Sequence, residues 1–171
     1  YLHSFSIAHR DLKPDNILLE KGVRRMRLKL ADFGLALPMT NSNYLSEDEG
    51  QHQRWCAPEC LDEMDYEVES FMKADIFSYG LVVHYMVTGV KPWASEKTVA
   101  TVYERFGIDN EVVLPEPPNN LGQGPLQDLY DSCLCIEPEK RPTAEEIINK
   151  KFQAHTTNPY TVTMQTAEFF T

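Results

Sequence analysis

The chain has 171 residues, enough for one domain with a sizeable core, and its 42% hydrophobic and 25% charged residues are ordinary for a globular protein. Its net charge of -10 argues against a general nucleic-acid binder, which needs a basic face. No apolar run approaches the ~20 residues of a membrane-spanning helix, and no signal-peptide pattern occurs. The four cysteines, spaced C-x3-C and C-x-C, do not match zinc motifs. We therefore expect reduced thiols and a cytoplasmic location.

The first part of the chain is expected to contain a β-hairpin. The run 9–16, HRDLKPDN, crowds charged and amide side chains around a proline, which predicts a loop. A short apolar run follows at 16–20, and a glycine-containing segment after it predicts a hairpin turn. Residues 26–30, MRLKL, alternate with period two, which predicts a half-buried strand. Its inward side is expected to carry Met26, Leu28 and Leu30.

The remainder is expected to be mainly helical after an exposed acidic loop at 39–50. The run 74–89 is apolar on nearly every side and ends at Gly89, which predicts a central buried helix with a glycine cap. Three further helices are expected at residues 94–107, 126–136 and 142–152. The last of them has Pro142 in its first turn and a capping box of Thr143 and Glu146. Residues 153–171 are expected to be a loose tail. The fold class predicted is α+β, mainly helical.

Polar residues stand on both sides of the predicted hairpin. Asp11 and Asn16 precede it, and Asp32 follows it directly. Because a hairpin returns its two ends to the same place, we expect these three side chains to lie within reach of one another. Two carboxylates and an amide oxygen suit Mg²⁺, which takes its remaining ligands from water and phosphate. Lys13 adds a positive charge suited to a phosphate oxygen, so the residues indicate handling of nucleotide phosphates with Mg²⁺.

Five motifs follow one another along the chain: IAHRDLKPDNILL at 7–19, LADFG at 30–34, CAPE at 56–59, DIFSYG at 75–80 and KRPT at 140–143. In this order and spacing, residues 1–152 resemble the C-terminal lobe of a eukaryotic protein kinase. The resemblance implies transfer of the ATP γ-phosphoryl group to hydroxyls of protein substrates, with ATP and Mg²⁺ as cofactors. It implies neither a nucleic-acid partner nor a membrane span.

The resemblance also implies roles for individual residues. Asp11 would be the catalytic base that orients the substrate hydroxyl, and Lys13 would neutralise the transferred phosphoryl group. Asn16 and Asp32 would bind Mg²⁺, and Leu18 would touch the adenine. Two other apolar residues fall beneath the adenine in the family but are expected here to be plain core: Val82 and Met86.

Further matches are implied to be structural or regulatory. Asp75 would anchor the catalytic loop, and with it two aromatic residues resemble the family's regulatory spine: His9 and Phe33. Gly34 completes the D-F-G motif, and a buried ion pair is implied between Glu59 and Arg141. Arg10 would bind a phosphate on the family's activation segment, which corresponds here to residues 32–59. Four hydroxyls are candidates to carry that phosphate: Thr40, Ser42, Tyr44 and Ser46.

Substrate class rests on two places in the sequence. Lys13 in DLKPDN is similar to serine/threonine kinases, whereas Trp55 in RWCAPE is similar to tyrosine kinases and the tyrosine-kinase-like serine/threonine branch. Together with DSCLCIEPEKRPT, they favour that branch. One departure is His52, which stands where serine/threonine kinases usually carry a threonine whose hydroxyl bonds the catalytic Asp and Lys.

The N-terminal lobe of a kinase has no counterpart in this sequence, since neither a G-x-G-x-x-G-x-V loop nor a V-A-I-K-type lysine occurs. We expect the chain to be inactive alone and to require the missing lobe of its parent chain. A pseudokinase scaffold remains an alternative, as do dual-specificity or tyrosine kinases. A small-molecule phosphotransferase is disfavoured by APE, DIFSYG and RPT, which build a platform for protein substrates. The absence of G-x-x-x-x-G-K-[ST] excludes a P-loop NTPase in this segment.

Overall fold

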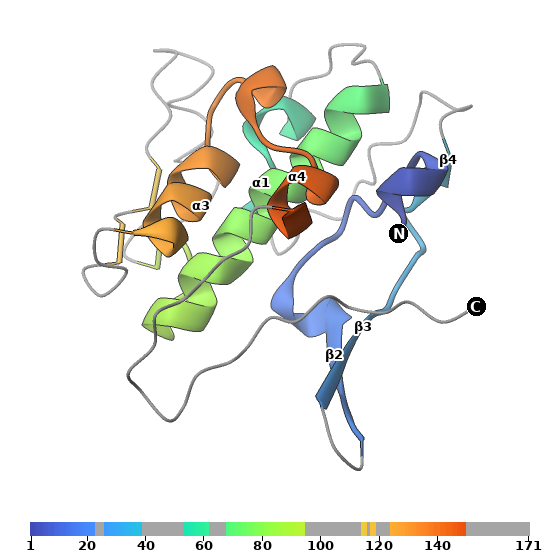
Figure 1. The fold of residues 1–171 in the computed structure, drawn as a ribbon, viewed down its shortest axis with the longest axis horizontal. Helices are drawn as coiled ribbons and strands as arrows, with labels where there is room; N and C mark the ends of the chain where they lie inside the picture. The colour runs from blue at the N-terminus through green and yellow to red at the C-terminus, as the bar shows by residue number, and fades with distance from the viewer. Residues whose placement is uncertain are drawn as a thin grey trace.

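The computed structural model describes residues 1–22, 26–38, 53–61, 68–94, 114–115, 117–118 and 124–149 (Figure 1). Within them the structure mixes helices with two small antiparallel sheets, one of β1 with β4 and one of β2 with β3. The strands are β1 (Ile7–Ala8), β2 (Ile17–Lys21), β3 (Met26–Leu30) and β4 (Leu37–Pro38), and the α-helices are α1 (Val68–Thr88), α3 (Pro125–Cys133) and α4 (Ala144–Asn149). Short 3-10 turns complete the described elements: His3–Phe5, Pro14–Asn16, Gln53–Trp55, Pro58–Leu61 and Pro138–Lys140.

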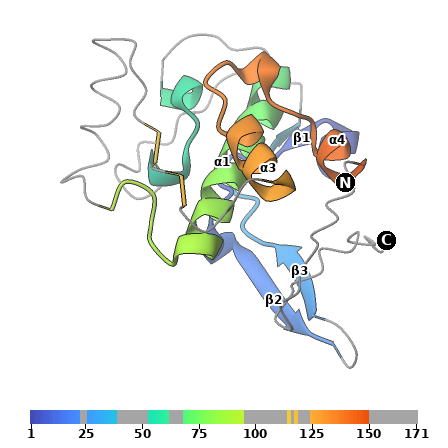
Figure 2. The same ribbon diagram turned by 60° about the vertical axis from the view of Figure 1, so that its left-hand side comes forward.

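Helix α1 is the centre of the fold. In Figures 1 and 2 it runs diagonally through the molecule, with α3 and α4 beside it. Phe77 and Leu81 on this helix are fully buried in the main core. The helix begins at Val68 rather than at the predicted Ala74. Residues 68–73 contain no Gly or Pro that would interrupt a helix, and the negative charge of Glu69 in the first turn is favourable at the positive end of the helix dipole. The prediction that Met86 belongs to the core is wrong, since 56% of this residue is exposed near the end of the helix.

The predicted glycine cap of this helix is confirmed. Gly89 has a φ of 69°, and its N–H donates to the carbonyl of Tyr85 at 2.8 Å. This left-handed conformation is costly for residues with a Cβ and open to glycine.

Replacing Gly89 with Ala is expected to lower the free energy of unfolding by about 1 kcal/mol, because alanine is strained at this φ. A Cβ at Gly89 would meet nothing within 4 Å, so the loss isolates the backbone effect. Gly124 is the matched control, since a Cβ there also meets nothing within 4 Å and its φ of 166° is extended. Urea unfolding followed by circular dichroism measures both variants. An equal effect of Gly89→Ala and Gly124→Ala would contradict the expectation.

The predicted hairpin is confirmed. Strands β2 and β3 pair antiparallel, from Ile17 opposite Leu30 to Lys21 opposite Met26. The prediction that residues 26–30 form a half-buried strand is wrong as to burial, because every residue of β3 is exposed. Figures 1 and 2 show the reason: the hairpin extends away from the helices. Ile17 at the start of β2 is partly buried against the main core, whereas the rest of β2 and all of β3 are exposed. The side chains predicted to face inward remain 36–64% exposed: Met26, Leu28 and Leu30.

Helices α3 and α4 correspond to the predicted helices at 126–136 and 142–152. Helix α3 ends at Cys133, before the predicted end, and residues 150–152 of the second prediction lie outside the described part of the chain. Helix α3 packs on α1 through Leu129 and Cys133. Helix α4 begins after the confirmed capping box, in which Glu146 N donates to Thr143 Oγ1 at 3.1 Å and Thr143 N donates to Glu146 Oε2 at 2.7 Å. Because Thr143 is the cap, Pro142 precedes the helix instead of lying in its first turn.

Several predictions lie outside the described residues: the loop at 39–50 with its four candidate hydroxyls, His52, nearly all of the helix at 94–107, and the tail at 153–171. None of the helices in the described part of the chain is long and apolar enough to cross a membrane.

Candidate functional site

The loop at 9–16, called the polar loop below, is held in place by Asp75 on α1. Its Oδ2 atom accepts a hydrogen bond from the backbone N–H of His9 at 2.7 Å, and its Oδ1 atom accepts one from that of Arg10 at 2.8 Å. His3 Nε2 also lies 2.9 Å from Oδ2. Asp75 is buried, so these donors compensate the loss of water around its carboxyl group. The central helix therefore fixes the loop backbone immediately before Asp11.

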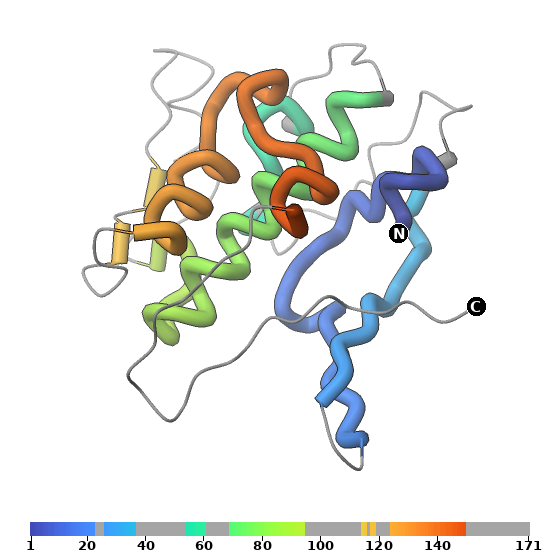
Figure 3. Tube along the Cα trace, in the orientation of Figure 1, coloured from blue at the N-terminus to red at the C-terminus, as the bar shows by residue number. Residues whose placement is uncertain are grey.

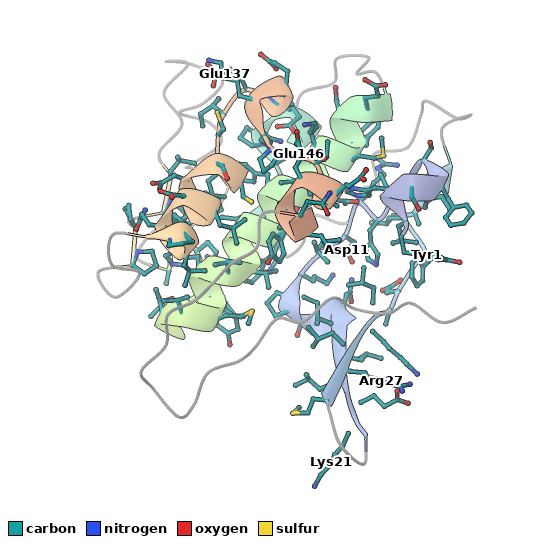
Figure 4. All side chains as sticks on the ribbon, viewed as in Figure 1. Tyr1, Asp11, Lys21, Arg27, Glu137 and Glu146 are labelled. Atoms are coloured by element: carbon teal, nitrogen blue, oxygen red, sulfur yellow. The ribbon has the colours of Figure 1, made fainter. Side chains whose placement is uncertain are left out.

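Three side chains of this loop form one polar cluster around Asp11. Lys13 Nζ donates to Asp11 Oδ2 at 2.7 Å. Asn16 Nδ2 donates at 2.8 Å to both the backbone carbonyl and Oδ2 of Asp11. Asp11 and Asn16 are buried, and Figure 4 shows Asp11 where the helical part of the molecule meets the hairpin. The loop thus closes on itself and presents one carboxylate, one ammonium and one amide together.

The segment after β3 is attached to the same loop, since β3 runs back along β2 toward it (Figure 3). The N–H of Ala31 donates to the carbonyl of Asn16 at 2.9 Å, and His9 Nε2 lies 3.0 Å from the carbonyl of Ala31. The rings of His9 and Phe33 contact each other with centroids 5.1 Å apart. These contacts bring the backbone at Asp32 beside the loop that carries Asn16.

Asp32 is exposed and has a φ of 62°, in the left-handed region. Its Oδ1 atom accepts a hydrogen bond from the N–H of Gly34 at 3.3 Å, which supports the turn. A non-glycine residue in this region stores strain, and such residues cluster at sites where a side chain must point in a fixed direction.

Two oxygens at this site suit a divalent cation. Asn16 donates its hydrogen bonds to Asp11 from Nδ2, so these bonds do not involve the amide oxygen of Asn16. Asp32 accepts the hydrogen bond from Gly34 at Oδ1, so this bond does not involve Oδ2 of Asp32. Hard oxygens few in number fit Mg²⁺, which keeps several waters or phosphate oxygens of its own. Within the described ranges no group of three or more His, Cys, Asp or Glu residues could hold a metal, so the fit rests on Asn16 and Asp32.

Arg10 points toward α1, where its guanidinium lies 4.8 Å from the ring centroid of Phe71. Its backbone is left-handed, with a φ of 66°. A guanidinium over an aromatic ring gains a cation–π attraction of about 0.5–1 kcal/mol at exposed sites. The hydroxyls predicted to carry a phosphate for Arg10 lie outside the described residues.

Glu59 and Arg141 form a two-point ion pair in the interior. Nη1 of Arg141 donates to Oε1 of Glu59 at 2.5 Å, and Nη2 donates to Oε2 at 2.8 Å. The side chains are 0% and 7% exposed, for Arg141 and Glu59 respectively. The pair joins the turn at Pro58–Leu61 to the segment that leads into α4.

The apolar residues predicted near the adenine separate in the structure. Val82 is buried in the main core, as expected of a plain core residue. Leu18 is 52% exposed on β2, on the hairpin that follows the polar loop.

Sequence reasoning missed two contacts at this site: His3 against Asp75, and Phe71 beneath Arg10. Both join residues more than sixty positions apart, and no local pattern marks either residue. An aromatic residue in the first turns of α1 is the single signal that could have pointed to Phe71.

Residues 1–153 match the family model of the protein kinase domain, and the chain belongs to that family.

Among curated proteins, the chain is 34% identical over 156 residues to the serine/threonine-protein kinase BCK1/SLK1/SSP31 of Saccharomyces cerevisiae, covering 89% of this chain and 10% of that protein. It is 36% identical over 156 residues to 3-phosphoinositide-dependent protein kinase B of Dictyostelium discoideum, covering 89% and 16%. It is 32% identical over 148 residues to the serine/threonine-protein kinase STY17 of Arabidopsis thaliana, covering 86% and 24%. The chain therefore spans a quarter or less of the length of these relatives.

Proposed function

We propose that this chain is the C-terminal lobe of a kinase that transfers the ATP γ-phosphoryl group to serine or threonine hydroxyls of protein substrates. The observation that carries the proposal is the joined arrangement of Asp11, Lys13 and Asn16 with the segment that carries Asp32. The names of the relatives support the serine/threonine class. Trp55 in RWCAPE supports the tyrosine-kinase-like branch.

Each group at the site has a task that follows from its chemistry. Asp11 accepts a hydrogen bond from the substrate hydroxyl and aims its oxygen at the phosphorus for in-line attack. Lys13, held against Asp11 in the structure, supplies a positive charge for the phosphoryl oxygens. Asn16 would hold Mg²⁺ through its amide oxygen and Asp32 through Oδ2, because their hydrogen bonds within the protein do not involve these atoms. When bound, this ion neutralises the charge that builds up on the phosphate oxygens.

The surrounding residues support this assignment. Asp75 holds the backbone of His9 and Arg10 immediately before Asp11, and Phe33 against His9 keeps the segment with Asp32 beside the loop. Leu18 would cover the adenine from below. Arg10 would receive a phosphate from the activation segment in place of its present contact with Phe71. Such a phosphate would come from one of four hydroxyls: Thr40, Ser42, Tyr44 or Ser46.

The chain alone is proposed to be inactive. The sequence of 171 residues has no glycine-rich loop over the phosphates and no strand lysine to pair with them. A parent chain that supplies both would supply the upper half of the nucleotide site.

The test uses the longer parent protein and ATP labelled at its γ-phosphoryl group, with a mixture of protein substrates. We expect label on serine and threonine after acid hydrolysis, dependence on Mg²⁺, and no label from residues 1–171 alone. Asp32→Asn is expected to raise the Mg²⁺ concentration needed for half-maximal transfer by at least about 10-fold, because it removes a charged ligand. Asp15→Asn, on an exposed carboxylate of the same loop, is the matched control and should leave this requirement unchanged.

Three outcomes would overturn the proposal in separable ways. Binding of ATP without any transfer, in wild-type protein, would assign the fold to a scaffold. Label on tyrosine alone would overturn the serine/threonine class. Label from the 171-residue chain alone would overturn its proposed dependence on a second lobe.

A further inference from the structure

Two cysteine thiols contact each other beside the site without taking part in it. Cys56 precedes the turn at Pro58–Leu61 and Cys60 lies within it, and their side chains are hydrogen-bonded to one another. The N–H of Cys60 donates to the carbonyl of Ala57 at 3.0 Å, so the backbone turns between Cys56 and Cys60. Neither cysteine forms a disulfide, and both residues keep part of their surface exposed.

The hydrogen bond between the two cysteines makes their thiols unequal. The hydrogen bond from Cys60 stabilises the thiolate of Cys56 and lowers the pKa of Cys56. The same bond, together with burial, raises the pKa of Cys60 well above its usual range. Arg10 favours the thiolate of Cys56, whereas burial and the carboxylates of Glu59 and Asp11 oppose it. Cys56 is therefore the member that loses its proton first, and Cys60 remains beside it as a thiol.

We propose that Cys56 and Cys60 are a modification site, a thiol pair that hydrogen peroxide converts into an intramolecular disulfide. This arrangement of a nucleophilic cysteine with a second cysteine in contact is the one that reversible thiol oxidation requires. The inference goes beyond phosphoryl transfer and does not depend on it.

The reaction balances in two steps. The Cys56 thiolate attacks one oxygen of the peroxide, breaks the O–O bond and becomes a sulfenic acid, while the departing hydroxide takes up a proton as water. The Cys60 sulfur then attacks the Cys56 sulfur, the S–O bond breaks, and the hydroxyl group leaves with the Cys60 proton as a second water. Two thiols are oxidised by two electrons, and one peroxide is reduced to two waters.

The position of the pair gives the bond a structural consequence. Glu59 lies between the two cysteines in sequence and is held by Arg141 across the core. A disulfide would therefore close a small ring around the residue that fixes this turn to the helical part. Since Asp11 and Arg10 both act on the charge of Cys56, the ring would form next to the polar loop.

The chain carries its own comparison pair. Cys133 is fully buried within α3, and Cys135 donates to Glu137 Oε2 at 3.4 Å rather than to a second thiol. Trypsin separates the two pairs, since Cys56 and Cys60 fall in peptide 55–73 and Cys133 and Cys135 fall in peptide 106–140.

The experiment exposes the purified full chain to increasing hydrogen peroxide, blocks remaining thiols with iodoacetamide, and maps the tryptic peptides by mass spectrometry. We expect peptide 55–73 to lose two hydrogens and both alkylation sites, and to recover them with dithiothreitol. This change is expected at ~10-fold lower peroxide than any loss of alkylation in peptide 106–140, because the thiolate and its partner are already in contact. Alkylation of both thiols at peroxide that already oxidises peptide 106–140 would overturn the proposal, as would sulfinic acid on Cys56 without a disulfide.

Two serine variants separate pairing from simple reactivity. Cys60→Ser should leave a sulfenic acid on Cys56 that dimedone traps, with no two-hydrogen loss. Cys135→Ser should behave like the wild type. Circular dichroism establishes that each variant is folded, and the wild-type peptide map decides the proposal even if one variant is not. A reversible two-hydrogen loss in peptide 55–73 of Cys60→Ser would contradict the assignment of Cys60.

Discussion

Replacing Arg141 with Ala is expected to lower the free energy of unfolding by about 3–5 kcal/mol, because it leaves the carboxylate of Glu59 buried without its partner. The ion pair is bidentate, with both oxygens of Glu59 accepting bonds from one planar guanidinium. Water has little access to either side chain, since they are 0% and 7% exposed. Few single changes in this fold remove so much at once.

Arg141 also donates hydrogen bonds to three backbone carbonyls around it. Its Nε donates to the carbonyl of Cys135 at 2.7 Å, and its Nη2 donates to that of Ile136 at 2.9 Å. Its Nη1 donates to the carbonyl of Lys73 on α1 at 3.1 Å, and Lys73 Nζ donates in return to the carbonyl of Arg141. The guanidinium lies 4.9 Å from the ring centroid of Phe77 in the core. A lysine could reach one of these partners but not all of them, so Arg141→Lys should also destabilise the fold.

Urea unfolding followed by circular dichroism measures the effect. The double variant Glu59→Leu with Arg141→Met is expected to lose less than Arg141→Ala, because it removes both buried charges together. Lys140→Ala is the matched control: the neighbouring residue also forms an ion pair, with Glu137 at 2.8 Å, but that pair is exposed and its loss should barely move the curve. Equal midpoints for Arg141→Ala and Lys140→Ala would refute the expectation. If Arg141→Ala does not fold, the free energies of unfolding of the double variant, Arg141→Lys and Lys140→Ala can still be compared with that of the wild type.

The polar loop shows what could be predicted from sequence. Its motifs placed Asp11 and Asn16 before a hairpin and Asp32 after it, and hairpin geometry alone requires the two ends to meet. The structure joins them through the backbone bond between Ala31 and Asn16. The left-handed backbone of Asp32 could not be predicted, because an aspartate's φ follows from its surroundings and not from its own preference.

Strand β3 and helix α1 show where local patterns mislead. Period-two alternation in MRLKL correctly indicated a strand, but it assigned a buried face that the structure does not have, because burial depends on what the rest of the chain places there. The apolar run at 74–89 located α1 but not its start, since polar and charged residues extend a helix as readily as apolar ones. Contacts such as His3 with Asp75 arise from tertiary packing and leave no local trace.

Replacing Asp11 with Asn is expected to reduce the rate of phosphoryl transfer by the parent protein by about 10²–10⁴-fold, the usual contribution of a positioned general base. The substitution is nearly isosteric. The asparagine can turn its amide oxygen toward Lys13 and Asn16, so both can still donate to it as they now donate to Oδ2. What is lost is the negative charge and the basicity that orient and accept the substrate's proton, which is why rate and not folding should fall.

The measurement is steady-state kinetics at varied ATP, with thermal unfolding of each variant alongside. Asp11→Asn is expected to lower kcat with little change in the KM for ATP, because Asn16 and Asp32 are the residues proposed to hold the metal that carries the nucleotide. Asp15→Asn makes the same chemical change on an exposed carboxylate of the same loop and should keep the wild-type kcat. A kcat for Asp11→Asn within about 3-fold of wild type, in a folded protein that transfers phosphate, would remove Asp11 from the role of base while leaving the family assignment intact.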